Sequence, residues 1–260
     1  MSIWQKLFKR NKQKHYNSLD WVGMDIHNHL LPGIDDGSDS VEKSIELIQG
    51  LKSLGIHHAI ATPHVMQGVH QNTPDTIIDA YNLLKKEIEK QEIEFELGFS
   101  AEYMIDDGLE EFIQKDQLCL LPNNHALIEM SYLQESHSIF TIVHQLLEKG
   151  IQPILAHPER YNYYHQDFKV YQMLKNAGCQ FQLNLLSITR YYGEAVKVVA
   201  LSLIKSGMYD YVGTDLHHLK HLNALSHLVQ KYDTRELLKN NPIKNLDLKE
   251  GRKHGKLYAV

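Results

Sequence analysis

His27 and His29 stand two positions apart at the end of an apolar run, and an acidic, glycine-containing segment follows them. Residues i and i+2 of a β-strand point to the same face of a sheet. Both imidazoles can therefore reach one point, and neutral imidazole is the commonest transition-metal ligand in proteins. We expect this pair to hold a metal ion at the end of a strand.

Further residues of metal-binding type lie at the ends of other apolar runs. Seven such runs occur in the chain, and only the run that ends at Asn184 lacks a histidine or carboxylate at its end. The candidates beyond the first run are His64, Glu102, Glu129, His157, Asp215 and His217. Each of them alone is more often a structural residue. Several unpaired carboxylates buried together, however, would cost several kcal/mol each. Cations offset that cost, so the set predicts a multinuclear metal site.

The donor set combines imidazole with carboxylate and includes no thiolate. It suits Mn²⁺, Fe²⁺ or Zn²⁺ and disfavours Ca²⁺ and Mg²⁺, which prefer shells made of oxygen atoms alone. Two or three such ions close together would deprotonate a bridging water and hold a phosphoryl or carbonyl oxygen. The chemistry expected of the site is therefore metal-assisted hydrolysis.

Alternating strands and helices must position these residues. The apolar runs cover residues 22–26, 58–62, 95–101, 126–130, 153–156, 179–184 and 209–214. Helical periodicity lies between them, at 41–54, 76–90, 138–149, 168–177 and 193–206. This alternation predicts a parallel sheet. Seven strands favour a closed or nearly closed α/β barrel, whose functional groups gather at the C-terminal ends of the strands.

Length and composition bound the organisation of the chain. Its 260 residues suit one large domain, and no linker rich in Pro, Gly or Ser divides it. We expect residues 1–18 to be a basic N-terminal extension and residues 19–260 to be a single barrel domain. About the last 20 residues are expected to form a closing strand, a partner-binding segment or a disordered tail. The extension is either a frayed terminus or a basic segment that contacts an anionic membrane surface or an acidic partner.

Several classes of protein are disfavoured. The net charge of -5 argues against a nucleic-acid binder, and no segment has the length of apolar residues that crosses a membrane. The N-terminus lacks the apolar core of a signal peptide, and two cysteines are too few for a disulfide framework, so we expect a cytoplasmic protein. Neither Cys119 nor Cys179 begins the C-x5-R sequence of a cysteine-based phosphatase, and both are expected in the core.

The order of the motifs resembles that of the polymerase-and-histidinol-phosphatase (PHP) family of metallo-phosphoesterases. Between about residues 25 and 221 the chain reads HxH, an Asp in the next turn, TPH, AE, IEMS, AHPERY and TDLH. It is most similar to the bacterial manganese-dependent tyrosine phosphatases that act on kinases controlling capsule and exopolysaccharide synthesis. The resemblance implies a distorted (β/α)₇ barrel with three metal ions, Mn²⁺ or else Fe²⁺ or Zn²⁺. It also implies a phosphotyrosine substrate, expected on a membrane-associated tyrosine kinase.

The resemblance also implies how the ligands are shared. The first ion would be held by His27, His29, Glu102 and Asp215. Glu102 would bridge to a second ion, which is completed by Glu129 and His157. The third ion would be held by Asp36, His64 and His217. Asp36 is preferred to Asp35 because family members place the ligand directly before the glycine of this turn.

Arg160 and His217 are the expected catalytic residues. Arg160, in the AHPERY motif, resembles an arginine at the mouth of the site in family members. Its planar fork of donors suits phosphate. The alternative is a salt bridge to a neighbouring carboxylate. Relatives often carry another arginine beyond the DxH motif. This chain offers Lys220 or His221 there, and Lys220 is the expected substrate-binding residue. Tyrosines that would stack on the substrate ring or form the rim are Tyr103, Tyr132, Tyr161, Tyr163, Tyr164, Tyr191 and Tyr192.

Three other functions remain open. A metallo-phosphatase for a small phosphomonoester such as histidinol phosphate would use the same barrel. An amidohydrolase would also begin with HxH, but it would usually want a lysine where this chain has Glu129. A non-catalytic, metal-stabilised scaffold that binds a kinase is disfavoured because no ligand type has been lost. A homo-oligomer is compatible with each of these functions.

Overall fold

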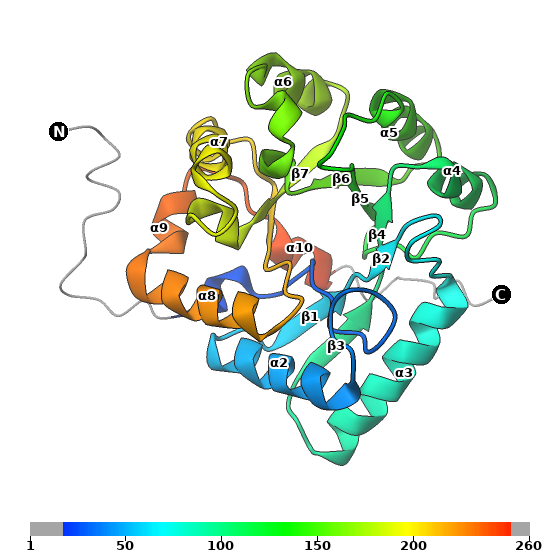
Figure 1. Cartoon of the computed structure of the whole chain (residues 1–260), viewed down its shortest axis with the longest axis vertical. Helices are drawn as coiled ribbons and strands as arrows, with labels where there is room; N and C mark the ends of the chain where they lie inside the picture. The colour runs from blue at the N-terminus through cyan, green and yellow to red at the C-terminus, as the bar shows by residue number, and fades with distance from the viewer. Residues whose placement is uncertain (1–17, 251–260) are drawn as a thin grey trace.

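A computed structural model describes residues 18–250, and Figure 1 shows helices arranged around a central group of strands. The strands are β1 (His58–Ala61), β2 (His64–Val65), β3 (Glu96–Phe99), β4 (Glu102–Met104), β5 (His125–Glu129), β6 (Gln152–Ala156), β7 (Gln180–Asn184) and β8 (Tyr211–Gly213). All but Ser18 of the expected N-terminal extension lies outside the described residues, and so do residues 251–260 of the expected tail.

The strands confirm the expected parallel α/β fold. Strands β1 and β3 pair in one sheet, and the second sheet has the order β2-β4-β5-β6-β7-β8; every pair is parallel. A closed seven-stranded barrel is not formed by the strands of residues 18–250. The expected strands 58–62 and 95–101 correspond to β1 and β3, and each is followed by a short further strand, β2 or β4, that was not expected. Pro63, which has no N–H to donate to a ladder, separates β1 from β2.

The first expected strand, 22–26, is not a regular strand. A 3-10 helix (Asp20–Val22) occupies its start, and only isolated bridges form, from Asp25 to Ala59 and from Asn28 to Leu216. The Asp25 carboxylate accepts hydrogen bonds from the His27 N–H (3.3 Å) and the Asn28 side chain (3.2 Å), so side-chain bonds replace part of a ladder. Residues 25–29 nevertheless lie between β1 and the chain after β8, because Asp25 N–H donates to His58 and His29 N–H donates to Leu216.

Five of the helices were expected from their periodicity. These are α2 (Val41–Ser53), α3 (Pro74–Lys90), α5 (Ile139–Glu148), α6 (Phe168–Asn176) and α7 (Glu194–Lys205). Ser40 and Thr73 cap α2 and α3 by accepting a hydrogen bond from the third helical N–H, which explains where these helices begin. Helices that the sequence did not delimit are α4 (Asp107–Gln114), α8 (Leu219–Lys231), α9 (Thr234–Leu238) and α10 (Asn245–Glu250).

The first part of the expected tail packs into the fold. Leu248 of α10 is fully buried in a small apolar cluster with Met24, Ile26 and residues of the strands. The Asn245 side chain donates to the carbonyls of Met24 and Val212, both at 2.8 Å, and its oxygen accepts from the Val212 N–H at 3.0 Å. This amide therefore joins residue 24 to β8 beneath the site described below.

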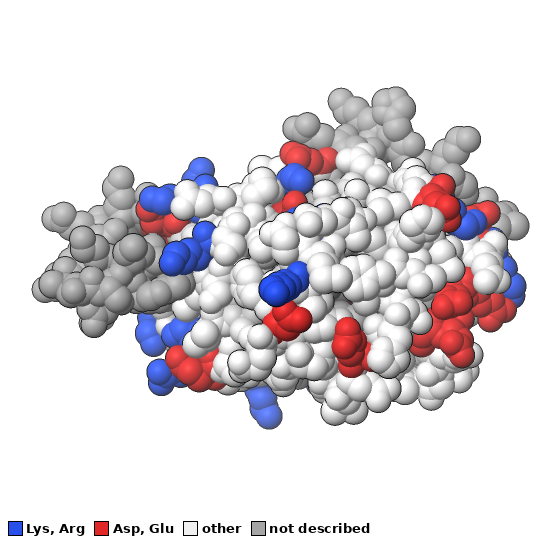
Figure 2. Space-filling view, turned by 90° about the horizontal axis from the view of Figure 1, so that it is seen from above, with Lys and Arg blue, Asp and Glu red and all other residues white. Residues whose placement is uncertain are grey.

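Helices α5, α6 and α7 present an outer face with few charges. Figure 2 looks onto this side of the molecule and shows a broad area with few charged side chains. Most of the Lys, Arg, Asp and Glu side chains in this view lie towards the two ends of the molecule. Large apolar side chains exposed on these helices are Phe140, Leu147, Phe168, Met173 and Val198. No helix within residues 18–250 combines the length and the hydropathy needed to cross a bilayer.

Candidate metal centre

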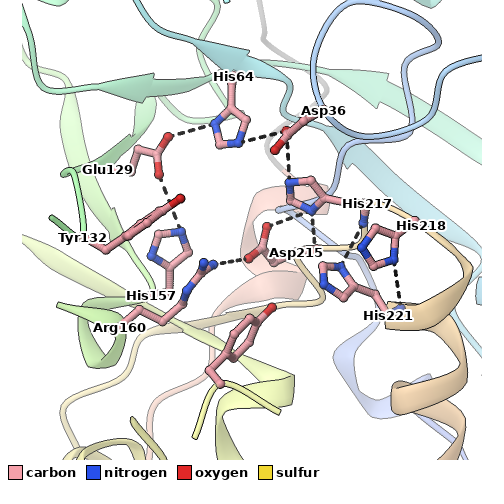
Figure 3. A pocket seen from close by; sticks show the side chains of 11 residues that line it. Asp36, His64, Glu129, Tyr132, His157, Arg160, Asp215, His217, His218 and His221 are labelled. Carbon is pink, nitrogen blue, oxygen red and sulfur yellow. Dashed lines mark hydrogen bonds and ion pairs between the residues drawn. The ribbon is translucent and has the colours of Figure 1, made fainter. Parts of the chain in front are cut away.

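All nine expected metal ligands meet in one cluster. Glu129 ends β5, whereas His64 and Glu102 begin the short strands β2 and β4, just beyond the ends of β1 and β3. His27 and His29 lie in the segment 25–29, and Asp36 lies in the turn before α2. His157 directly follows β6, and Asp215 and His217 lie in the short segment between β8 and α8. They form four overlapping groups in which the candidate ligand atoms lie within 4.8 Å of one another. Figure 3 shows the mouth of this cluster, a pocket of about 210 Å³, with Arg160 and Tyr132 at its side.

The deepest group surrounds the Glu102 carboxylate. His27 Nε2 lies 3.1 Å from Glu102 Oε2 and 3.3 Å from Asp215 Oδ1. His29 Nε2 lies 3.5 Å and 3.4 Å from the same two oxygens. All four side chains are buried. This is the set that was expected to hold the first ion.

Glu102 also faces a second group. Its Oε1 lies 3.2 Å from His157 Nε2, and Glu129 Oε2 lies 3.9 Å from the same nitrogen. His64 Nδ1 approaches this group as well, at 2.8 Å from Glu129 Oε1 and 3.1 Å from Glu102 Oε2. His64 was expected to belong to the third group alone. The structure places it between the second group and the third.

The third group lies nearest to solvent. Asp36 Oδ1 is 3.5 Å from both His64 Nε2 and His217 Nε2, and the Asp36 side chain is 61% exposed. The neighbouring Asp35 points inward instead, where its Oδ2 lies 2.8 Å from His29 Nδ1 and accepts a hydrogen bond from the His64 N–H. The two aspartates of this turn thus face different partners, and only Asp36 borders the mouth.

The inward-facing atoms fit bound cations. Buried side-chain atoms without a hydrogen-bond partner include His27 Nε2, His29 Nε2, His64 Nδ1, Glu129 Oε1 and both carboxylate oxygens of Glu102. A buried polar atom left unsatisfied costs about 1–3 kcal/mol. Metal ions would satisfy these atoms together, and the donor set is of the kind that Mn²⁺, Fe²⁺ and Zn²⁺ accept.

The opposite ring nitrogens are held by hydrogen bonds. His27 Nδ1 lies 2.8 Å from Gln182 Oε1, His29 Nδ1 lies 2.8 Å from Asp35, and His217 Nδ1 lies 2.9 Å from the Asp215 carbonyl. Ligating histidines typically donate their second N–H in this way, which leaves the first nitrogen's lone pair facing the metal.

Two residues of β7 in this outer layer were missed by the sequence analysis. Gln182 orients His27, and the Asn184 side chain donates to Asp215 Oδ2 at 2.8 Å. Both are fully buried. Their spacing of i, i+2 places them on one face of the strand, which is a signal that the sequence did contain.

The charges of the cluster stabilise one another. Burial alone would lower the pKa of His27, but the carboxylates of Glu102 and Asp215 outweigh it and raise that pKa to about 9. Burial likewise opposes ionisation of Glu102, yet His27 and His64 hold its pKa well below the ordinary value. Near neutral pH, and without metal, His27 therefore keeps its proton beside the ionised carboxylates of Glu102 and Asp215.

Two candidate ligands have a left-handed backbone. His157 has φ of 32° and Asp215 has φ of 51°, in a region that non-glycine residues seldom adopt. Such conformations cost of order 1–3 kcal/mol and persist where the surrounding structure imposes them. Here they turn the chain sharply after β6 and β8, at the two places where a ligand is delivered to the cluster.

Arg160 lies at the mouth and already has a carboxylate partner. Its Nη1 is 2.7 Å from Asp215 Oδ2, so the alternative of a salt bridge is realised in this structure. The guanidinium also lies over the rings of Tyr192, at 4.5 Å, and Tyr132, at 5.9 Å. Within residues 18–250, Asp215 is the carboxylate that Arg160 contacts, and the guanidinium lines the pocket with its other donors.

The expected tyrosines and Lys220 are only partly where they were placed. Tyr132 and Tyr192 line the mouth, but Tyr103, Tyr161 and Tyr164 are buried core residues and cannot stack on a substrate. Lys220 lies outside the mouth and borders an adjoining cavity. Burial raises the pKa of the Cys119 thiol to about 11 and that of Cys179 to about 12, so neither is an activated nucleophile.

Gly213, the last residue of β8, permits the close approach of His27. A Cβ atom there would lie 2.6 Å from His27 Cβ and 2.7 Å from Gln182 Nε2. We expect Gly213→Ala to destabilise the protein by about 1–3 kcal/mol through this overlap and to weaken metal uptake by displacing His27. Thermal unfolding and metal analysis of the purified variant test this, and an unchanged melting temperature with full metal content would contradict it.

Comparisons with known proteins agree with this arrangement. The family model for capsular polysaccharide synthesis, CpsB/CapC, matches residues 23–246. Tyrosine-protein phosphatase YwqE of Bacillus subtilis is 30% identical to this chain over 201 residues, which cover 77% of this chain and 79% of that protein. Tyrosine-protein phosphatase CpsB of Streptococcus pneumoniae is 29% identical over 238 residues, which cover 85% of this chain and 97% of that protein.

A solved structure is similar to the fold as well. It comes from a study of YwqE from Bacillus subtilis and CpsB from Streptococcus pneumoniae, described there as unique metal-dependent tyrosine phosphatases, and matches with a TM-score of 0.73 and 28% identity. The match covers 85% of this chain and 96% of the other. The resemblance inferred from the motifs is thereby confirmed, and the chain belongs to the CpsB/CapC family of capsular polysaccharide synthesis proteins.

Proposed function

We propose that this chain is a metal-dependent protein tyrosine phosphatase. The observation that carries the proposal is the buried cluster of imidazoles and carboxylates whose inward atoms lack hydrogen-bond partners, with Arg160 at its mouth. The names of the relatives YwqE and CpsB support the reaction and the residue type. No cysteine of residues 18–250 is placed or ionised for the alternative, thiolate chemistry.

We propose three bound ions, with Mn²⁺ the expected metal and Fe²⁺ or Zn²⁺ the alternatives. The first would be held by His27, His29, Glu102 and Asp215, and the second by Glu102, Glu129 and His157, with His64 beside them. The third would be held by Asp36, His64 and His217. The two sheets and residues 25–29 would together act as the distorted (β/α)₇ barrel that brings these ligands to one mouth.

The ions, when bound, would supply a deprotonated water and neutralise charge on the phosphoryl oxygens. Arg160 would bind the phosphate through the N–H groups that do not contact Asp215, and Tyr192 holds the guanidinium plane beside the mouth. His217 Nδ1 donates to the Asp215 carbonyl, which can only accept, so Nε2 is the nitrogen that would bind the third ion. Phenolate is a good leaving group, so tyrosine phosphate needs little acid catalysis.

Hydrolysis assays test this function directly. With Mn²⁺ present, we expect a phosphotyrosine peptide to be hydrolysed far faster than the matched phosphoserine peptide or histidinol phosphate, and chelation to abolish the activity. Preference for histidinol phosphate would instead favour a small-molecule phosphatase. Activity that survives complete metal removal would contradict the proposal.

We further propose the protein substrate and the compartment. The description of the family supports a role in capsular polysaccharide synthesis, and the names of the relatives support a phosphotyrosine protein as substrate. A membrane-associated tyrosine kinase is the partner we expect. The two free cysteines are compatible with a cytoplasmic location. An increase in the phosphotyrosine content of such a kinase after deletion of this phosphatase would support the assignment.

Metal uptake should release protons. A ligating histidine must be deprotonated, and His27 has a pKa of about 9 in the protein without metal. At pH 7 binding therefore displaces a proton from His27, and affinity rises by up to about tenfold per pH unit until the pH passes this pKa. Because the folded pKa lies above the unfolded value of 6.5, the stability from protonated His27 is complete below pH 6.5 and is lost as the pH rises through about 9.

Calorimetric titration with Mn²⁺ in buffers of different ionisation enthalpy measures the number of protons released. We expect at least one at pH 7 and fewer above pH 9. Thermal unfolding of the metal-free protein across the same range gives a second readout, with the melting temperature falling as the pH rises. Proton release that does not change with pH would contradict the role of His27.

A further inference from the structure

We propose that a second cavity beside the mouth selects the residues that flank the phosphotyrosine, and that it takes a large apolar side chain with an acidic group at its edge. This inference rests on the function proposed above. The cavity measures about 320 Å³ and lies between the starts of α2 and α8. His217 and His218 line both it and the mouth, so the two spaces are neighbours.

The interior of the cavity suits an apolar group. Leu47, buried within α2, and Leu219, which is 40% exposed at the start of α8, supply apolar surface on two sides. A cavity of about 150 Å³ is already large enough for a benzene ring, so this one can receive a leucine or an aromatic side chain. Since a peptide residue advances the chain by about 3.3 Å, a side chain within one or two residues of the phosphotyrosine can reach it.

The edge of the cavity is cationic. Lys43 is paired with Asp39, whereas Lys220 has no ion-pair partner within residues 18–250. Helices α2 and α8, each of 13 residues, both begin here, and helix N-termini carry partial positive charge. An acidic substrate residue would therefore be attracted to Lys220, whereas the neighbouring mouth, which contains Asp36, Glu129 and Asp215, would repel it without bound cations.

Peptide pairs test the apolar part. Two phosphotyrosine peptides would differ only in carrying leucine or glycine on both sides of the phosphotyrosine. We expect the wild-type protein with Mn²⁺ to show kcat/KM about tenfold higher for the leucine peptide. Burial of a leucine side chain is worth roughly a factor of 10 to 100 in affinity. Leu219→Asp should bring the ratio of the two values close to one. Asp favours a helix start, so this variant should still fold.

Val198→Asp is the control, because Val198 is an exposed apolar residue on α7 that lines neither cavity. It should keep the tenfold ratio.

A second pair of peptides, with aspartate or asparagine beyond the apolar residue, tests Lys220. Lys220→Glu should reverse the preference for aspartate, and Lys205→Glu at the end of α7 should not change it.

The outcomes separate the two proposals. If the wild-type protein hydrolyses no phosphotyrosine peptide, the proposed function is wrong. If it hydrolyses all of them with similar kcat/KM, or if Leu219→Asp keeps the preference for leucine, the phosphatase function stands and the cavity is not a peptide subsite. A preference for aspartate that does not depend on the apolar residue would also overturn the subsite described here.

Discussion

Glu102→Gln is expected to lower kcat/KM for a phosphotyrosine peptide by at least about 10³-fold, because a metal ion contributes several kcal/mol to transition-state stabilisation. Glu102 is the common member of the two deepest groups, and its two oxygens face His27, His29, His64 and His157 within 3.5 Å. Glutamine keeps the shape of the side chain but removes the charge that would bridge two ions. Metal content should therefore fall together with activity.

Metal analysis and steady-state kinetics on the same preparations measure this effect. Glu94→Gln is a suitable control, since Glu94 is exposed just before β3 and makes the same change of charge outside the cluster. It should retain both metal and activity. A Glu102→Gln protein that keeps all its metal and more than a tenth of its activity would show that Glu102 does not bridge two ions.

The sequence predicted which residues meet better than it predicted the geometry of the strands. His157 and Asp215 could be placed together because the carboxyl ends of parallel strands converge on one edge, whatever the exact strand bounds. The strand expected at 22–26 was wrong in detail, since hydrogen bonds accepted by the Asp25 carboxylate replace part of its ladder. His27 and His29 still face one point, because contacts on both sides hold residues 25–29.

Lys220 and Gln182 show what a motif cannot supply. Lys220 was expected at the mouth because it follows the DxH motif, but α8 begins at Leu219 and carries the lysine to the adjoining cavity. Gln182 reaches His27 over 155 residues of chain, which is a contact that no local pattern encodes. Residue types at strand ends are therefore predictable, whereas the side chains that orient them depend on packing between distant segments.

Arg160→Ala is expected to lower kcat/KM by about 10²–10³-fold, the usual effect of removing one donor to charge that develops in a transition state. The variant should keep its metal. Asp215 loses one partner, but the Asn184 side chain still donates to its Oδ2 at 2.8 Å and holds the carboxylate in place. Activity and metal content should thus separate, unlike in Glu102→Gln.

Arg160→Lys refines this prediction. Lysine keeps the positive charge near Asp215 but lacks the planar fork that matches two phosphate oxygens and stacks on Tyr192. We expect it to restore only a small part of the lost activity, whereas Arg190→Lys, at an exposed pair with Glu194, should change nothing. If Arg160→Ala loses metal in proportion to activity, the main role of Arg160 is to hold Asp215. If metal stays bound while kcat/KM falls, Arg160 acts on the phosphate itself.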